Sequence, residues 1–534
     1  MATSVLGTEA GPPTGERDDL RLSGAPDRKI RSAGTDAALF TGATYLAQIL
    51  MFAAGLLQKG LLGPVGAGYW ALMQAFWVYL TIGSLGTMAG TGRQIPVRRG
   101  RGDLEGAAAV ANTGSTFSVV AVGIVGTLVA AVALVAGGGW PDEIRYGLVL
   151  LGVLAPLRIF ADAQRSIMQA VKRFDVASVT AVVEAAVTLT LGTLCVVFFG
   201  FYGMFAGVLL TVVGMYISWA RLGMATWRRP AFAWRFDRRL LGELMSFGFP
   251  IMLQGQIWLL FMSIDNLIVA GFISVKELGY YALAVSVTGY VLHLPRSVGA
   301  ALFPRMTETF GETGDVRSIR HFAVDTQRLL AYLLVPLFLG GAYFLVPVLI
   351  RHALPEFEPA IPVVHIMVAG SFLMALMNMP TKMLTTAGYR WGVTALGLLC
   401  LAINAGANYL AVAVFDWGLE GAAGATVLSY LLAFLIMTSY ALSKAFTRRE
   451  VFLHICELLG VIAYVIGAAW GVELVIGSGA GPLVSDALVG IAKVALFVLA
   501  IAPLLLLSER RYQGLTRIRG MVVTAVRKVA DRRR

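Results

Sequence analysis

The sequence is poor in charged residues and in the residue types that build catalytic and metal sites. Only 14% of its 534 residues are charged, against about a quarter in an average soluble protein. The dipeptide Gly-Lys never occurs, which excludes a phosphate-binding loop of the G-x-x-x-x-G-K-[ST] type, and the patterns H-E-x-x-H and C-x-x-C are also absent. The five histidines are far apart, and Cys195, Cys400 and Cys456 lie in or beside apolar runs. We therefore expect no enzyme, no cofactor, no metal site and no disulfide.

Long apolar runs are what the sequence has instead. Hydrophobic residues make up 57% of the chain, and a run of about 20 of them spans a bilayer as a helix. Because the runs show no period-2 alternation, they are expected as helices that satisfy their own backbone hydrogen bonds. The pattern predicts an all-α integral membrane protein with fourteen transmembrane helices, at 37–58, 68–89, 107–136, 145–164, 175–198, 201–224, 245–272, 279–301, 322–350, 361–386, 392–414, 418–442, 452–476 and 485–507.

Lysine and arginine are distributed very unevenly between the predicted connections. With both termini cytoplasmic, 37 of the 43 basic residues fall on inner segments and only four, Lys59, Arg145, Lys276 and Arg351, on outer ones. Inner connections of membrane proteins carry this excess, so both termini are predicted to be cytoplasmic in a plasma or inner membrane. The net charge of +12 then reflects topology, and no nucleic-acid partner is expected.

Three landmarks recur in the same order at a nearly constant offset. The stretch 68–72 returns at 279–283 after 211 residues, Gly200-x-x-Gly203 returns as Gly418-x-x-Gly421 after 218, and the turn 172–174 returns at 389–391 after 217. Two lobes of six helices with the same orientation explain the recurrence, as in transporters built from parallel repeats. The predicted division is a disordered cytoplasmic tail (1–36), an N-lobe (37–225), a linker (226–240), a C-lobe (241–445), helices 13 and 14 (446–508) and a basic tail (509–534).

The linker and the C-terminal tail are both rich in basic residues. The segment 226–240 contains two tryptophans and five arginines, which suits either a helix at the membrane interface or a plain charged loop. Within the tail, 513–530 places valines, Leu515 and Ile518 on one helical stripe surrounded by basic residues. This pattern predicts an amphipathic helix whose partners are the anionic lipids of the inner leaflet.

A set of weak motifs, taken together in order, resembles one transporter family. The motifs are Leu62-Gly63-Pro64 through Gly86 to Arg93, Phe247-Gly248-Phe249-Pro250, Asp265-Asn266-Leu267-Ile268, the stretch 278–282, Phe303-Pro304-Arg305 and the stretch 418–423. From 37 to 445 the chain resembles the polysaccharide (O-antigen type) flippases of the multidrug/oligosaccharidyl-lipid/polysaccharide exporter superfamily. The resemblance implies that a polyprenyl-diphosphate-linked oligosaccharide is flipped from the inner to the outer leaflet for cell-surface polysaccharide assembly, with a polysaccharide polymerase and glycosyltransferases as possible partners. A drug or metabolite exporter of the same superfamily and a peptidoglycan-precursor flippase remain the alternatives.

Such a substrate needs cations for its diphosphate and amides and aromatic rings for its sugars. Cations stand at the inner ends of predicted helices, where each also satisfies the charge bias of topology: Arg93, Arg165, Arg173, Arg305, Lys382 and Arg390. Amides and an aromatic ring lie within the spans, where helix-to-helix hydrogen bonding is the alternative role: Gln48, Gln58, Gln74, Gln254, Gln256, Trp258 and Asn378.

Two acidic residues lie inside predicted spans. Glu184 is about two turns into the fifth helix, and Asp265 lies in the outer third of the seventh, beyond an expected kink at Pro250. An acid within the membrane is costly unless it has a role. We therefore expect these two residues to carry a coupling proton or sodium ion or to form gates, with structural pairing as the alternative.

Overall fold

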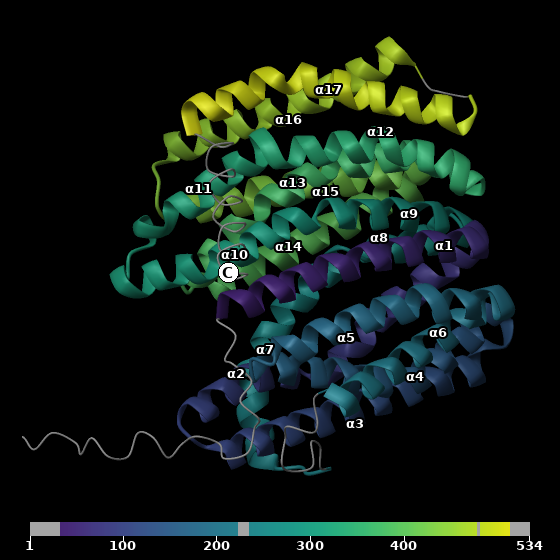
Figure 1. Cartoon of the computed structure of the whole chain (residues 1–534), viewed down its shortest axis with the longest axis vertical. Helices are drawn as coiled ribbons and strands as arrows, with labels where there is room; N and C mark the ends of the chain where they lie inside the picture. Colours follow the sequence, from purple (N-terminus) through teal and green to yellow (C-terminus); the bar gives the residue numbers. More distant parts are fainter. Residues whose placement is uncertain (1–32, 223–233, 478–480, 513–534) are drawn as a thin grey trace, which may run out of the picture.

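The computed structural model describes residues 33–222, 234–477 and 481–512, and all regular structure in these ranges is helical (Figure 1). The first part of the chain forms α1 (Ala33–Thr81), α2 (Thr87–Gly100), α3 (Leu104–Ala136), α4 (Asp142–Ala170), α5 (Phe174–Val187) and α6 (Thr193–Leu222). The second part forms α7 (Arg238–Phe261), α8 (Ile264–Phe272), α9 (Val275–Val291), α10 (His293–Thr313), α11 (Arg320–Leu329), α12 (Val335–Ala353), α13 (Ile361–Thr386), α14 (Arg390–Tyr409) and α15 (Gly418–Leu442). The last two helices are α16 (Arg448–Ile476) and α17 (Leu483–Tyr512).

Eleven helical stretches of the described chain are long and apolar enough to cross a membrane. Two of them each contain two predicted spans separated by a break at a glycine. Gly63 interrupts Gly42–Ser84 with φ 64° and ψ 179°, and Gly200 interrupts Phe174–Arg221 with φ 54° and ψ −132°. The predicted span 279–301 falls on α9 and α10 together. The all-helical, multi-pass membrane architecture is thus confirmed, whereas the count of fourteen spans and the side of the termini stay predictions.

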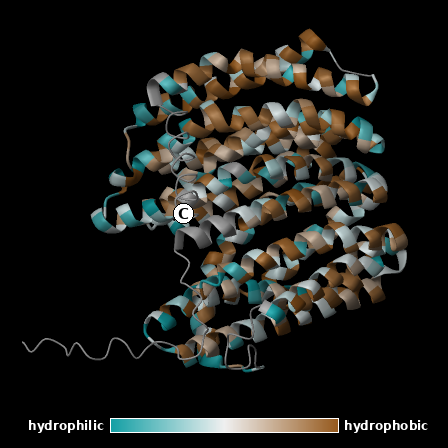
Figure 2. Ribbon diagram, viewed as in Figure 1, coloured by the Kyte–Doolittle hydropathy of each residue, from teal (hydrophilic) through white to brown (hydrophobic). Residues whose placement is uncertain are grey.

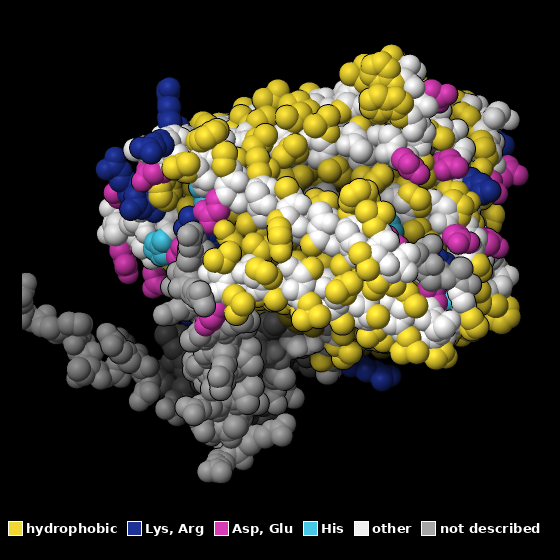
Figure 3. All heavy atoms as spheres, turned by 90° about the horizontal axis from the view of Figure 1, so that it is seen from above, with side chains coloured by type: hydrophobic (Ala, Val, Ile, Leu, Met, Phe, Trp, Pro, Cys, Tyr) yellow, Lys and Arg dark blue, Asp and Glu magenta, His cyan; other side chains and the backbone are white. Residues whose placement is uncertain are grey.

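The outer surface has the distribution expected of a membrane protein. Figure 2 shows hydrophobic residues along the middle of most helices. In Figure 3, apolar side chains cover the middle of the visible face and charged side chains gather toward its two ends, with many Lys and Arg at the end where α10 and α11 lie. Exposed leucine, valine and phenylalanine side chains are numerous among the described residues, as a lipid-facing surface requires.

Helices from the two halves of the chain cross at glycines. α1 packs along α9, and α2 packs along α7. At the second crossing a Cβ atom on Gly86 would lie 2.4 Å from the carbonyl carbon of Gly248, and one on Gly248 would lie 2.0 Å from the carbonyl oxygen of Gly86. Since Cβ atoms do not approach backbone so closely, only glycine permits this separation of the two helices.

Several local expectations need correction or fall outside the described residues. α7 runs without a break through Pro250 and ends at Phe261, so the interruption before Asp265 lies at residues 262–263. α1 begins at Ala33, and the rest of the predicted N-terminal tail is outside the described ranges, as are 513–534 of the C-terminal tail. The described part of the predicted linker is 234–240: residues 234–237 have no regular structure, and 238–240 already belong to α7.

Ion pairs join α16 to a preceding helix and to α17. Arg328 on α11 contacts Glu457 on α16 at 2.7 Å, and Lys493 on α17 contacts Glu473 on α16 at 2.8 Å. These four charged side chains therefore have counter-charges, which compensate much of the cost of burying them.

Candidate functional site

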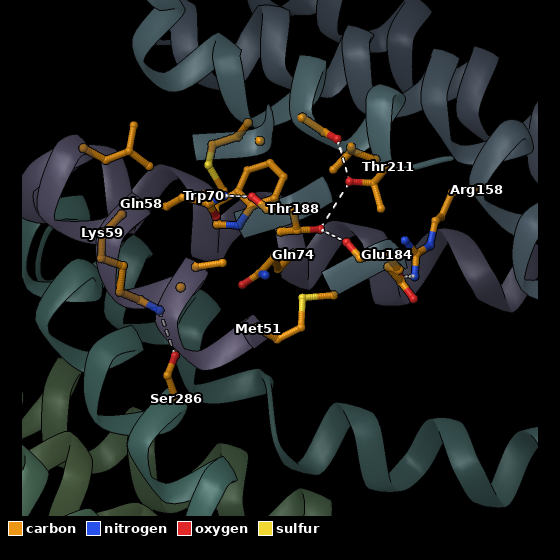
Figure 4. A pocket seen from close by; sticks show the side chains of 18 of the residues that line it. Met51, Gln58, Lys59, Trp70, Gln74, Arg158, Glu184, Thr188, Thr211 and Ser286 are labelled. Carbon is orange, nitrogen blue, oxygen red and sulfur yellow. Dashed lines mark hydrogen bonds and ion pairs between the residues drawn. The ribbon is translucent and has the colours of Figure 1, made fainter. Parts of the chain in front are cut away.

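A cavity of about 360 Å³ lies beside α1, and we call it the α1 cavity (Figure 4). Side chains from α1, α4, α5, α6 and α9 line it, so it adjoins both halves of the chain. Its polar and aromatic lining consists of Gln58, Lys59, Trp70, Gln74, Arg158, Glu184, Thr188, Thr211, Ser286 and Tyr290. Three of the residues predicted from the sequence, Gln58, Gln74 and Glu184, thus meet around one space.

Gln58 is held in place by a hydrogen bond to a carbonyl oxygen in an irregular turn between α5 and α6. Residues Thr188–Gly192 form a π-helical turn between α5 and α6, and such turns leave backbone groups without their usual partner. The Gln58 amide Nε2 donates to the carbonyl oxygen of Thr188 at 3.1 Å. Gln74, by contrast, is exposed and points into the cavity, and no hydrogen bond joins it to another described residue (Figure 4).

Glu184 is a buried carboxylate between two arginines. Arg158 contacts it at 2.8 Å, and Arg165 contacts its other oxygen. Arg158 also contacts Asp162, one turn further along α4, at 3.3 Å. The two arginines compensate the negative charge of Glu184, so its geometry fits the structural pairing that was the alternative to a coupling role. Arg165, in turn, is not a free cation.

Lys59 is the cation of the α1 cavity that lacks a carboxylate partner. Its ammonium Nζ donates to the Ser286 hydroxyl of α9 at 2.9 Å, and the described residues contain no ion pair to it. The sequence pattern placed Lys59 in an outer connection directly after the span 37–58. In the structure α1 continues past Lys59 to Gly63 before it breaks, so the backbone of Lys59 is helical. The half-buried ammonium therefore faces the cavity between the two halves of the chain.

A second cavity of about 250 Å³ lies beside α13, and we call it the α13 cavity. Its lining combines two cations, an amide, a hydroxyl and an indole with apolar side chains, and contains no acidic side chain. The lining residues are Trp258, Met262, Leu292, Pro295, Arg296, Met374, Ala375, Met377, Asn378, Thr381 and Lys382. The structure brings together three predicted substrate contacts, Trp258, Asn378 and Lys382, and adds Arg296.

Gly299 keeps the α13 cavity open beside its polar groups. A Cβ atom there would lie 2.4 Å from Asn378 Oδ1 and 3.1 Å from Lys382 Nζ. Asn378 Oδ1 is buried and has no hydrogen-bond partner in the described part of the chain, although buried polar atoms are normally paired. A polar ligand in the cavity would satisfy this oxygen.

The consecutive helices α9 and α10 contribute lining residues to the two cavities. Ser286 and Tyr290 on α9 line the α1 cavity, and Arg296 at the start of α10 lines the α13 cavity. α9 and α10 are separated only by Leu292, whose backbone is helical. At 1.5 Å per residue, Arg296 is about 9 Å along the axis from Tyr290 and about 15 Å from Ser286.

Asp265 belongs to a separate buried polar network. The Tyr281 hydroxyl is 2.5 Å from Asp265 Oδ2 and 3.0 Å from the Thr426 hydroxyl, and Asn408 Nδ2 donates to that hydroxyl at 3.0 Å. Asn404 on the same helix donates to the carbonyl oxygen of Phe261 at 2.7 Å. No cationic side chain takes part in these contacts. Oxygen atoms in such an arrangement are suited to a proton or to a hard cation such as Na⁺.

The remaining predicted contacts do not line either cavity. Arg93 is exposed and its guanidinium lies 3.6 Å from the Phe247 ring centroid. Arg305, within α10, and Arg390, the first residue of α14, are also exposed. Arg173 forms an ion pair with Asp175 at 2.9 Å.

The other predicted glycan contacts also lie away from the cavity linings. Gln256 donates from Nε2 to the Thr81 hydroxyl at 3.1 Å and so links α7 to α1, and Gln48 and Gln254 are half-buried. Sequence reasoning missed Lys59, Trp70, Arg296, Ser286 and Tyr290 as cavity residues. Among these residues, only Arg296 had a sequence feature that could have marked it as a binding residue, since it is a cation next to a proline within a predicted span.

Comparisons with known proteins agree with this architecture. Residues 110–354 match the family described as "Polysaccharide biosynthesis protein", and a search of the curated proteins found no match. An inward-facing multidrug resistance MATE family transporter of the MOP superfamily superposes with a TM-score of 0.64 at 16% identity, covering 78% of this chain and 98% of the other. The lipid II flippase MurJ, in an inward closed conformation, gives 0.61 at 15% identity, covering 90% of this chain and 100% of the other. These two likenesses concern the fold.

Proposed function

We propose that this chain, a multi-pass membrane protein, flips a polyprenyl-diphosphate-linked oligosaccharide. The match of residues 110–354 to the family described as "Polysaccharide biosynthesis protein" and the fold likeness to a transporter and a flippase support this proposal. The substrate would move from the inner to the outer leaflet of the cell membrane by alternating access and serve cell-surface polysaccharide assembly. Glycosyltransferases that supply the glycan and a polymerase that consumes it are the partners this role requires.

The observation that carries the proposal is the lining of the α13 cavity. Arg296 and Lys382 offer two positive charges without a carboxylate among the other lining side chains. A diphosphate carries matching negative charge, and the planar guanidinium of arginine binds phosphate oxygens in a bidentate manner. The unpaired Asn378 oxygen and the Trp258 ring next to them suit the first sugar.

The α1 cavity supplies the space for the rest of the glycan. Its amides Gln58 and Gln74 and its rings Trp70 and Tyr290 are the side chains that bind sugar hydroxyls and sugar faces. A substrate with its diphosphate at Arg296 would extend its glycan along α9 into this space. Rocking of one predicted lobe against the other, in a fourteen-span protein with both ends inside, would then expose the site to either side.

The membrane potential favours the proposed direction. An anionic head group moving outward from a negative interior gains about 2.3 kcal/mol per charge per 100 mV, or about 5 kcal/mol for two charges. A coupled ion is therefore not needed to drive the loaded step. We propose that Asp265 binds a proton or Na⁺ during the return of the empty protein, because its network contains only oxygen and amide groups.

The alternatives differ in what the cavities would bind. An exporter of cationic drugs requires free acidic side chains, whereas the carboxylate in the α1 cavity is neutralised by arginines. A peptidoglycan-precursor flippase is favoured by the likeness to MurJ over 90% of this chain, and it would use the same cations for its diphosphate.

Flipping in proteoliposomes tests the proposal. The probe is a fluorescent polyprenyl-diphosphate carrying a short neutral glycan, with an impermeant quencher outside. Arg296→Gln and Lys382→Gln should each slow flipping at limiting substrate by about 10-fold or more, as expected for loss of a charge-assisted contact. Arg317→Gln, at an exposed residue remote from both linings, is the control for net charge. Flipping by neither the wild type nor the control, or equal rates in all four proteins, would refute the assignment.

A further inference from the structure

The α1 cavity contains one more positive charge than its acidic residues compensate. Arg158 and Arg165 neutralise Glu184, and Arg158 also contacts Asp162. Lys59 takes part in none of these pairs, and within the described ranges its ammonium has only the Ser286 hydroxyl as partner. Hence no acidic side chain in the described part of the chain compensates the positive charge of Lys59.

An ammonium in this position is costly for an empty cavity. Lys59 lies in a helical stretch that is long and apolar enough to span the membrane, where a charge without a counter-charge is strongly unfavourable. The ammonium has three hydrogens, of which the Ser286 oxygen receives one, while the Ser286 hydroxyl itself donates to the carbonyl of Ala282 at 2.7 Å. The two remaining hydrogens are available for an oxyanion in the cavity.

The neighbours of Lys59 indicate which oxyanion. Amides and aromatic rings line the same cavity as Lys59: Gln58, Trp70, Gln74 and Tyr290. Amides and aromatic rings are the groups that contact sugars. Arg296, the α10 cation suited to the diphosphate, lies about 9 to 15 Å further along the axis of α9 and α10 than Tyr290 and Ser286, in the α13 cavity. We propose that Lys59 binds the carboxylate of an acidic sugar, so that the flipped glycan contains a uronic acid or a similar acidic residue. This inference rests on the proposed function and specifies its substrate class.

Titration calorimetry on the purified full-length protein in nanodiscs tests the inference. The probes are a tetrasaccharide containing glucuronic acid and the same tetrasaccharide after reduction of its carboxyl groups. The wild type should bind the acidic form about 10-fold or more tightly than the reduced form. Lys59→Gln should bind both forms with the affinity that the wild type shows for the reduced one, and Lys59→Arg should keep the preference.

Two further measurements separate this role from a structural one. Ser286→Ala removes the present partner of Lys59 without changing charge, so it should keep or increase the preference for the acidic probe. Inorganic diphosphate should not compete with the acidic probe in the wild type. Competition that disappears in Lys59→Gln would assign the lysine to the diphosphate and overturn the inference, as would equal affinity of the wild type for the two tetrasaccharides.

The inference and the proposed function can fail separately. If the wild type flips the neutral lipid-linked probe in an Arg296-dependent manner but shows no preference for the acidic tetrasaccharide, only the acidic-sugar assignment is wrong. If the preference is present and depends on Lys59 but no lipid-linked probe is flipped, the site binds acidic glycans and the flippase proposal is wrong.

Discussion

Gly68 and Gly279 form a reciprocal contact between α1 and α9. A Cβ atom on Gly68 would lie 1.8 Å from the carbonyl oxygen of Val275, and one on Gly279 would lie 1.8 Å from the carbonyl oxygen of Pro64. Both glycines and both carbonyls are 211 residues apart, which is the offset of the predicted repeat. The contact therefore has the symmetry expected if α1 and α9 are equivalent elements of two lobes that meet here.

The first prediction concerns this contact. Gly68→Ala and Gly279→Ala should each force α1 and α9 apart, because the added methyl group overlaps a backbone oxygen. Gly289→Ala on the same helix, where nothing lies within 4 Å, is the matched control. Spin labels at the exposed positions Leu61 and Lys276 should report a longer mean distance in the first two variants only. An unchanged distance would show that the helices do not need this separation.

A second prediction concerns the ion pairs of Glu184. Glu184→Gln leaves Arg158 and Arg165 without their buried counter-charge, and breaking a buried pair in this way costs about 3 kcal/mol. The variant should lose thermal stability in detergent. Adding Arg158→Gln should restore part of the loss, since the two changes act on one pair. Strictly additive losses would contradict the pairing, and full stability with lost ion-dependence of flipping would favour a coupling role.

The third prediction addresses Asp265. Asp265→Asn keeps the size of the side chain but removes the carboxylate, and should abolish any response of the flipping rate to a pH or Na⁺ gradient. Thr426→Ser, which retains the hydroxyl of the network, should preserve the response. Initial rates in proteoliposomes under each gradient are the measurement. A gradient response that survives in Asp265→Asn would place the coupling ion elsewhere.

A fourth prediction compares two exposed arginines outside the cavities with Arg296, an arginine that lines the α13 cavity. Arg93 and Arg305 are exposed and line neither cavity, so the roles left for them are the first capture of a diphosphate or the charge bias of topology alone. Arg93→Ala and Arg305→Ala should weaken substrate affinity less than Arg296→Ala does, and their effect should shrink at high salt because exposed charges are screened. Flipping rates at 0.05 and 0.5 M salt separate the two groups.

The fifth prediction tests topology. In a protein whose three native cysteines are replaced by serine, single cysteines at Gly138 and Ser478 should react with an impermeant maleimide from outside intact cells. Cysteines at Gly102 and Thr447 should react only after the membrane is opened. Labelling of the Thr447 position from outside would exclude the fourteen-span arrangement with both termini inside.

Much of the candidate site was accessible to sequence reasoning, but only as unconnected residues. Trp258, Asn378 and Lys382 were each chosen for their chemistry, and the structure places them around one cavity. Arg165 was chosen on the same grounds and is instead neutralised by Glu184. Nothing in the sequence distinguishes Lys382 from Arg165, since both stand near inner ends of apolar runs.

The sequence by itself determined the apolar helices, the absence of known catalytic motifs and the approximate repeat, because hydrophobic length and composition act locally along the chain. Only the tertiary structure decided which polar groups meet, because pairing depends on the rotation and separation of helices distant in sequence. It continued α1 past Lys59 and aimed that ammonium at Ser286 of α9, 227 residues away. It likewise placed Arg296 about 9 Å along the helix axis from Tyr290, whose cavity has a lining suited to sugars. This follows because α9 and α10 succeed one another almost without a break.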